Sequence, residues 1–176
     1  EMVLLSLDGE ELVQGELPMD EGAGDDIEGL SINPTGDVVA LTSDGALRAW
    51  TLMPGGPVLS RMAYPLSDDP QWLCGEDSEE EDCPDFEGIC LDPAPASGPC
   101  AGFAVSKSRG KLVCLEDTST GYVLRPDSAV TVGEPGQLSG CDYELEPPHR
   151  LLVGTNDHGD NALWEIRDPR DPSRAS

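Results

Sequence analysis

Four carboxylates in two nearly identical phrases are the first residues that could do chemistry. The phrases "DIEGL" and "DFEGI" each place an acidic residue two positions before a Glu-Gly pair. If the two phrases fold alike around a shared axis, their glutamates meet, repel each other and attract a cation, and oxygen ligands suit calcium. The alternative is structural, with each Glu accepting hydrogen bonds from backbone N–H groups at a junction between repeats. The candidate metal-binding residues are Asp26, Glu28, Asp85 and Glu87.

The stretch "SKSRGK" is the basic cluster of an otherwise acidic chain. It contains Lys107, Arg109 and Lys111. The planar guanidinium of Arg109 could hold a phosphate or a carboxylate through paired hydrogen bonds. The alternative is a hairpin turn whose charges are simply solvated.

The stretch "TNDHGDN" brings Asp157, His158 and Asp160 together. A His–Asp pair can act as a general base. The sequence offers no Ser or Cys in a nucleophile elbow of the Gly-x-Ser-x-Gly kind. We therefore expect a turn here rather than catalysis, and a protein that is more a binder than an enzyme.

The charge of the chain is strongly negative. Thirty-five Asp and Glu face ten Lys and Arg, for a formal charge of −25. Seven carboxylates fall in the segment 75–85, but without the spacing of an EF-hand loop, so we expect a solvated loop there. The charge argues against nucleic acid and anionic membranes as partners. It suits a cation, a basic partner or simple solubility.

The six cysteines show no CxxC spacing, and two histidines are too few for an ordinary zinc site. An even number in a Gly- and Pro-rich chain predicts disulfides in an oxidising compartment, so the protein is expected to be secreted, periplasmic or at the cell surface. The alternative is free thiols in a cytosolic protein. The pair that brackets the acidic loop is the best guess, and sequence cannot assign the other partners. The cysteines are Cys74, Cys83, Cys90, Cys100, Cys114 and Cys141.

Membrane insertion is not expected, because no run approaches the roughly 18 apolar residues of a spanning helix. No signal peptide is recognisable. The chain opens in what looks like the middle of a strand. We therefore expect that further sequence, with any export signal, precedes residue 1.

Three stretches of the chain look like copies of one unit, with Gly29, Gly88 and Gly140 in register. The spacings are 59 and 52 residues, obtained by subtracting these residue numbers. Each copy continues with short apolar runs separated by turns, such as "DVVALT" followed by the hairpin signal Asp44-Gly45. Pro and Gly interrupt nearly every window that could hold a helix. The pattern predicts an all-β fold made of repeated small antiparallel sheets, as in β-propeller blades.

The predicted domain covers residues 1–167, and a polar tail occupies 168–176. Four-stranded blades give about three and a half blades, whereas closed propellers usually have ~4–8. The chain could close a small four-bladed ring, be part of a larger ring, or pair with a second copy. An unclosed set would expose an apolar end face. The expected blades are 1–20 (partial), 26–70, 85–133 and 138–167.

The phrase "D-x-E-G-[LI]" resembles the one that opens successive blades in phytase-like and esterase-like β-propellers. The resemblance covers most of residues 2–167, although the third copy has Ser139 where Glu would stand. It implies a six-bladed ring, calcium bound around the central channel and, in the phytases, hydrolysis of phosphate esters. The matching glutamates would be Glu28 and Glu87.

From these observations we expect an extracellular β-propeller that acts as a binding or scaffold module, with calcium as its structural ion. One alternative is a calcium-dependent phosphoric-ester hydrolase of the phytase-like type, in which a carboxylate-bound metal activates water. Another is a protein–protein interaction part of a larger assembly. The expected partner is then another protein or a second copy of the chain.

Overall fold

The computed structural model describes most of the chain. Residues 2–5, 8–9, 11–20, 26–74, 83–93, 100–132, 134, 137–144, 150–156 and 162–166 are described. All regular elements of these residues are strands, apart from the short 3-10 helix η1 (Pro70–Trp72). No helix within this part of the chain is long and apolar enough to cross a membrane.

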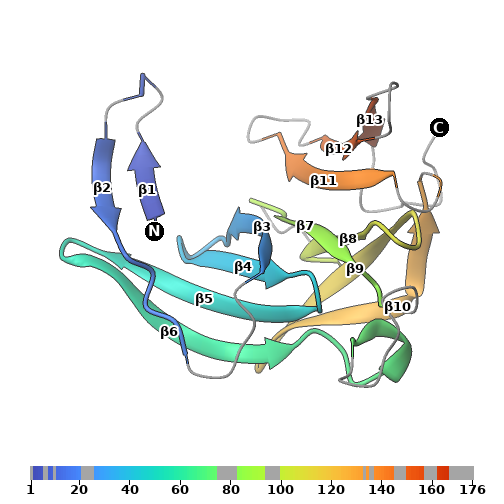
Figure 1. Ribbon diagram of the computed structural model, residues 1–176, viewed down its shortest axis with the longest axis horizontal. Helices are drawn as coiled ribbons and strands as arrows, with labels where there is room; N and C mark the ends of the chain where they lie inside the picture. Colours follow the sequence, from blue (N-terminus) through green and yellow to red (C-terminus); the bar gives the residue numbers. More distant parts are fainter. Residues whose placement is uncertain are drawn as a thin grey trace.

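Four antiparallel sheets follow one another along the sequence (Figure 1). Each is built from consecutive strands, so every connection within a sheet is a hairpin. A two-stranded sheet contains β1 (Met2–Leu5) and β2 (Glu11–Gly15). The first larger sheet contains β3 (Ile27–Ile32), β4 (Val38–Thr42), β5 (Ala46–Met53) and β6 (Gly56–Pro65). The second contains β7 (Phe86–Leu91), β8 (Gly102–Ser106), β9 (Lys111–Thr118) and β10 (Gly121–Thr131), and the third contains β11 (Leu138–Tyr143), β12 (Leu151–Thr155) and β13 (Leu163–Ile166).

The first strands of the three larger sheets lie next to one another. In Figure 1, β3, β7 and β11 occupy the middle of the molecule, while β6 and β10 run along its outside. β7 contacts both β3 and β11. The second strands β4 and β8 are buried along their whole length, since sheets or loops cover both of their faces. This explains why their sequences are continuous apolar runs rather than alternating ones.

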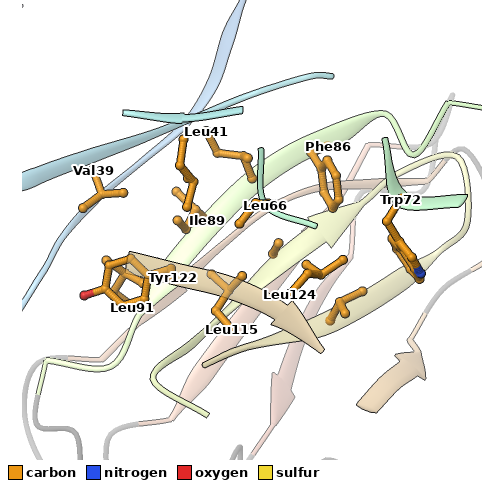
Figure 2. Close-up of a cluster of buried hydrophobic side chains, with 13 residues drawn as sticks. Val39, Leu41, Leu66, Trp72, Phe86, Ile89, Leu91, Leu115, Tyr122 and Leu124 are labelled. Atoms are coloured by element: carbon orange, nitrogen blue, oxygen red, sulfur yellow. The ribbon is translucent and has the colours of Figure 1, made fainter. Parts of the chain in front are cut away.

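The main core lies between the first and second sheets (Figure 2). Leu41 and Leu47 of the first sheet meet Ile89 and Leu115 of the second. Each is at most 2% exposed, and burying such a side chain contributes about 2 kcal/mol relative to leaving it in water. A second cluster, which includes Phe103 and Leu151, joins the second sheet to the third.

The segment that follows β2 crosses the outer face of the first sheet. The carbonyl of Pro18 accepts a hydrogen bond from the Trp50 indole at 2.8 Å, and the Asp20 carboxylate lies 2.8 Å from Arg48 Nε. Arg48 is fully buried, and both its terminal nitrogens lack a hydrogen-bond partner within the described residues. The backbone N–H of Ala63, followed by Arg48, holds the pKa of Asp20 below its ordinary value. This ion pair therefore fixes the segment onto the sheet.

Three disulfides join the six cysteines. Cys74 pairs with Cys83, the pair favoured from the sequence. Cys100 pairs with Cys114 inside the second sheet region, and Cys90 on β7 pairs with Cys141 on β11, with Cα atoms 5.8 Å apart. The last of these links two sheets covalently. Three disulfides and no free thiol fit an oxidising environment.

The all-β prediction is confirmed, with larger sheets of four, four and three strands. The described strands do not close a ring. Gly29 packs against β7, so the alternate residues Leu30 and Ile32 point the other way and are 57% and 55% exposed. Leu163 on the third sheet is 70% exposed. The two end sheets thus carry exposed apolar side chains.

Candidate functional site

The repeated Glu-Gly phrase forms the same β-bulge in each first strand. In β3, Ile27 pairs with Thr42 and Gly29 with Leu41, so Glu28 has no partner in the ladder. Glu87 is the extra residue of β7 in the same way. A bulge leaves one residue unpaired and turns its side chain away from the regular alternation.

The third sheet repeats this bulge without a carboxylate. Leu138 pairs with Thr155 and Gly140 with Gly154, so Ser139 is the extra residue. Serine at the third position means that the bulge itself does not require a Glu. The three bulges therefore bring two carboxylates and one hydroxyl to equivalent places.

The glycines of the phrase let the first strands approach closely. A Cβ on Gly29 would lie 2.7 Å from the backbone N of Ile89, and one on Gly88 would lie 2.9 Å from the Cα of Gly140. Real Cβ atoms do not approach backbone this closely, so no side chain fits between the strands. Gly140 has a φ of 156°, at the edge of the region that side chains rarely adopt. Close packing is thus the reason for the first two glycines, and backbone conformation for the third.

The leading residue of the phrase makes the same backbone contact in all three larger sheets. The carbonyl of Asp26 accepts a hydrogen bond from Ser43 N at 3.1 Å, and that of Asp85 accepts from Lys107 N at 2.8 Å. In the third sheet the carbonyl of Gln137 accepts from Asn156 N at 2.7 Å. A Gln serves here as well as an Asp, so this contact does not depend on the carboxylate.

A buried hydroxyl residue ends the second strand of each of the three larger sheets, and the sequence-based prediction missed it. Thr42 accepts a hydrogen bond at 2.9 Å from the N–H of Ala46, which begins β5, and Thr155 accepts one at 2.9 Å from the N–H of Ala162, just before β13. Ser106 donates instead to the carbonyl of Pro84. The signal was available, because "ALTSDG", "AVSKSRG" and "VGTND" all carry a hydroxyl residue after the apolar run. These hydroxyls fix the hairpins that carry the site.

Lys107 joins the two candidate sites that the sequence kept apart. Its ammonium lies 2.5 Å from Glu87 Oε1, and the two side chains are 36% and 18% exposed. The hydrogen bond that Lys107 donates to Glu87, aided by the nearby charges of Asp85 and Glu28, raises the pKa of Lys107. The ammonium is therefore held in its charged form among these carboxylates.

Glu28, unlike Glu87, forms no ion pair among the described residues. Desolvation raises the pKa of Glu28, and the negative charges of Glu87 and Asp26 raise it further. The nearby Lys107 opposes this shift. A carboxylate repelled in this way gains from a neighbouring cation, so Glu28 is the residue of the phrase best suited to bind one.

The fit of calcium to this group is incomplete. Within the residues that the structure describes, no three of the His, Cys, Asp and Glu side chains are placed to hold a metal ion. The Lys107 ammonium already supplies the positive charge beside Glu87. The calcium site thus stays a prediction, because the described residues do not form a ligand set for it.

The rest of the basic cluster has structural contacts instead of forming a shared anion site. The Arg109 guanidinium stacks over the Trp72 ring at 4.4 Å and donates a hydrogen bond to the carbonyl of Gln71. Lys111 lies on the neighbouring strand β9 and is half-buried. The three cations therefore do not converge on one position. Most of the acidic loop, together with Asp157, His158 and Asp160, lies outside the described residues.

Chemically, the site is a small charge network on closely packed strands. It holds two carboxylates and the Ser139 hydroxyl at the three bulges, together with the Lys107 ammonium. Such an arrangement can bind a polar group or a cation at Glu28 and can rigidify the junction between sheets.

No family model matches the chain, and no curated protein matches it. Among solved structures, the PQQ-bound form of aldose sugar dehydrogenase from Streptomyces coelicolor is similar over 78% of this chain and 40% of that one, with 18% identity and a TM-score of 0.49. The fold described above rests on the sheets of this chain alone.

Proposed function

We propose that the chain is part of an extracellular β-propeller that serves as a binding or scaffold module. One observation carries this proposal: three successive sheets share the same bulge and the same close contact between first strands. Blades around an axis meet in this way. The link between Cys90 and Cys141 fixes two of them together and supports an oxidising location.

A binding role is favoured over ester hydrolysis by the charge network. A metal-dependent hydrolase needs carboxylates that are free to hold the ion which activates water. Glu87 is instead paired with Lys107. Calcium enters this proposal only as a structural ion beside Glu28.

Two measurements on the same preparation test this function. Release of nitrophenol from p-nitrophenyl phosphate is expected to stay at the buffer rate with calcium or with EDTA. Thermal unfolding is expected to shift upward with calcium in the wild type but not in Glu28→Gln. Turnover that is lost in Glu28→Gln or Glu87→Gln would instead support the hydrolase. The control is Asp127→Asn, which removes an exposed carboxylate on β10.

The exposed end faces favour a second role as part of a larger assembly. Leu30 and Ile32 stand exposed on the first strand of the first sheet, and Leu163 stands exposed on the last sheet. Exposed apolar side chains at sheet ends suit contact with a further sheet, from another protein or from a second copy. We expect association in light scattering that weakens in Leu30→Ser/Ile32→Ser but persists in Val58→Ser, which changes an exposed residue of β6. A monomer at all concentrations would contradict self-association.

A further inference from the structure

A cleft of about 390 Å³ opens between the first and second sheets, apart from the first-strand site formed by Glu28, Glu87 and Lys107. Its walls come from the connection between β3 and β4 and from β4, β5 and β6 on one side, and from the hairpin of β9 and β10 on the other. Its volume lies in the range of small-ligand sites. The groups that matter for binding are Arg61, Tyr64, Asp117 and Tyr122.

Opposite charges face this cleft without neutralising each other. Asp117 pairs in the β9–β10 ladder with Tyr122, so the carboxylate and the phenol lie side by side on the same face. The Arg61 guanidinium stacks over the Tyr64 ring at 5.3 Å and donates to the carbonyl of Thr120. Among the described residues, Arg61 and Asp117 do not form an ion pair with each other.

The two phenols are placed to donate hydrogen bonds into the cleft. The Tyr64 oxygen accepts the backbone N–H of Tyr122 at 3.1 Å, so its own O–H is available to a ligand. Figure 2 shows the Tyr122 hydroxyl pointing away from the apolar cluster. Burial, followed by the charge of Asp117, raises the pKa of Tyr122 to about 12, so this phenol keeps its proton at neutral pH.

The other carboxylate of the cleft is already satisfied. Asp37 accepts hydrogen bonds from Thr51 at 2.6 Å, from Thr35 at 3.2 Å and from Asn33 at 3.5 Å. Asp37 is therefore part of the wall of the cleft, and Asp117 is the lining carboxylate that can pair with the cationic group of a ligand. The apolar side chains Val39 and Ala49 complete the lining.

We propose that this cleft binds a small zwitterion of the free α-amino acid type. Its ammonium would pair with Asp117, and its carboxylate would accept hydrogen bonds from Arg61 and the phenols. A zwitterion matches both charges at once and carries no net charge, so the −25 charge of the protein neither attracts nor repels it. A single anion would be repelled by that charge, and a single cation would meet Arg61.

Three probes that differ by one charged group test the proposal: L-leucine, 3-methylbutylamine, which lacks the carboxylate, and 4-methylpentanoate, which lacks the ammonium. Binding to the full chain is followed by saturation-transfer NMR and calorimetry. L-leucine is expected to bind at least about tenfold more tightly than either probe with one charge, since each lost charge contact leaves its partner unpaired.

Variants assign the contacts. Asp117→Asn should weaken L-leucine about tenfold and leave 4-methylpentanoate unchanged, because only the ammonium contact is lost. Arg61→Gln should show the reverse selectivity, with the amine unaffected. Asp127→Asn, an exposed carboxylate on β10 outside the cleft, should behave as the wild type.

Several results would overturn the proposal. These are no saturable binding of L-leucine, equal binding of the amine and L-leucine, or an equal loss in Asp127→Asn. Asp117 is exposed, so its variant is expected to fold, and an unchanged unfolding temperature checks this. Because the cleft shares no residue with the first-strand site, these outcomes are independent of the calcium and phosphatase measurements.

Discussion

Loss of the disulfide between Cys90 and Cys141 should destabilise the protein more than loss of the disulfide that brackets the acidic loop. In the chain-entropy description, a cross-link stabilises by limiting the unfolded chain, and its effect grows with the logarithm of the loop length. The sequence separations are 51 residues for Cys90–Cys141 and 9 for Cys74–Cys83. These correspond to about 4 and about 2.7 kcal/mol.

The nested disulfide changes this comparison little. Cys100 and Cys114 lie inside the larger loop and shorten it by their own separation of 14 residues. The shorter loop lowers the larger value by only about 0.3 kcal/mol, which leaves a difference of about 1 kcal/mol between the two links. Cys90 is also 1% exposed in the core, so removal of its sulfur adds a packing loss in the same direction.

The measurement uses two double variants, Cys90→Ala/Cys141→Ala and Cys74→Ala/Cys83→Ala, each of which keeps the other two disulfides. Equilibrium unfolding in urea, followed by tryptophan fluorescence, gives the midpoint and the slope for each. We expect the first variant to remain folded, since the close contact of Gly88 with Gly140 persists. A smaller loss in the first variant than in the second would refute the reasoning.

Three further outcomes are expected. Gly88→Ala should cost about 1–3 kcal/mol in urea unfolding, because its Cβ would meet β11 backbone at 2.9 Å, whereas Gly55→Ala, with nothing within 4 Å, should stay within about 0.5 kcal/mol of the wild type. In carboxyl NMR titration the raised pKa of Glu28 should rise further in Lys107→Met, and an unchanged value would contradict the charge network. Because the pKa of Glu28 is raised, its protonated form stabilises the fold at low pH, and this stabilisation is lost as the pH rises through the raised pKa. The stability of Glu28→Gln relative to the wild type should therefore increase over that pH range. The lowered pKa of Asp20 has the opposite effect: the ionised carboxylate stabilises the fold above its ordinary pKa, and this stabilisation is lost as the pH falls through the lowered value. Asp20→Asn should therefore be less stable than the wild type at neutral pH and should lose less stability on acidification, as monitored by fluorescence.

The repeat could be predicted because its signals are local. Gly29, Gly88 and Gly140 each sit beside a bulge, and a glycine in a strand marks such a place in sequence. The second strands β4 and β8 could be predicted because burial on both faces leaves an uninterrupted apolar run in the sequence. Asp44-Gly45 marked its hairpin because Gly45 has a φ of 90°. Each of these features is set within a few residues of chain.

The pairing of distant groups could not be predicted in the same way. Cys90 and Cys141 meet only because β7 and β11 lie side by side, and nothing near either cysteine specifies that neighbour. The cleft has the same origin, since Arg61 and Asp117 come from the outer strands of different sheets. Such contacts depend on how whole sheets pack, which a single sequence does not encode at any one position.

The position of Lys107 shows how this limit affects the functional interpretation. In sequence, Lys107 belongs to a basic turn and Glu87 to an acidic phrase 20 residues earlier, so each suggested its own ligand. The fold places the turn that follows β8 beside the start of β7, because the backbone N–H of Lys107 bonds to the carbonyl of Asp85. Like charges forced together by close strand packing require a counter-charge, and a lysine in the chain supplies one without an external ion. A substitution that removes Lys107 should therefore increase the affinity of Glu28 and Glu87 for calcium, and a calcium titration of Lys107→Met against the wild type measures this directly. Equal calcium affinity in the two proteins would mean that the ammonium is not the cation that balances these carboxylates.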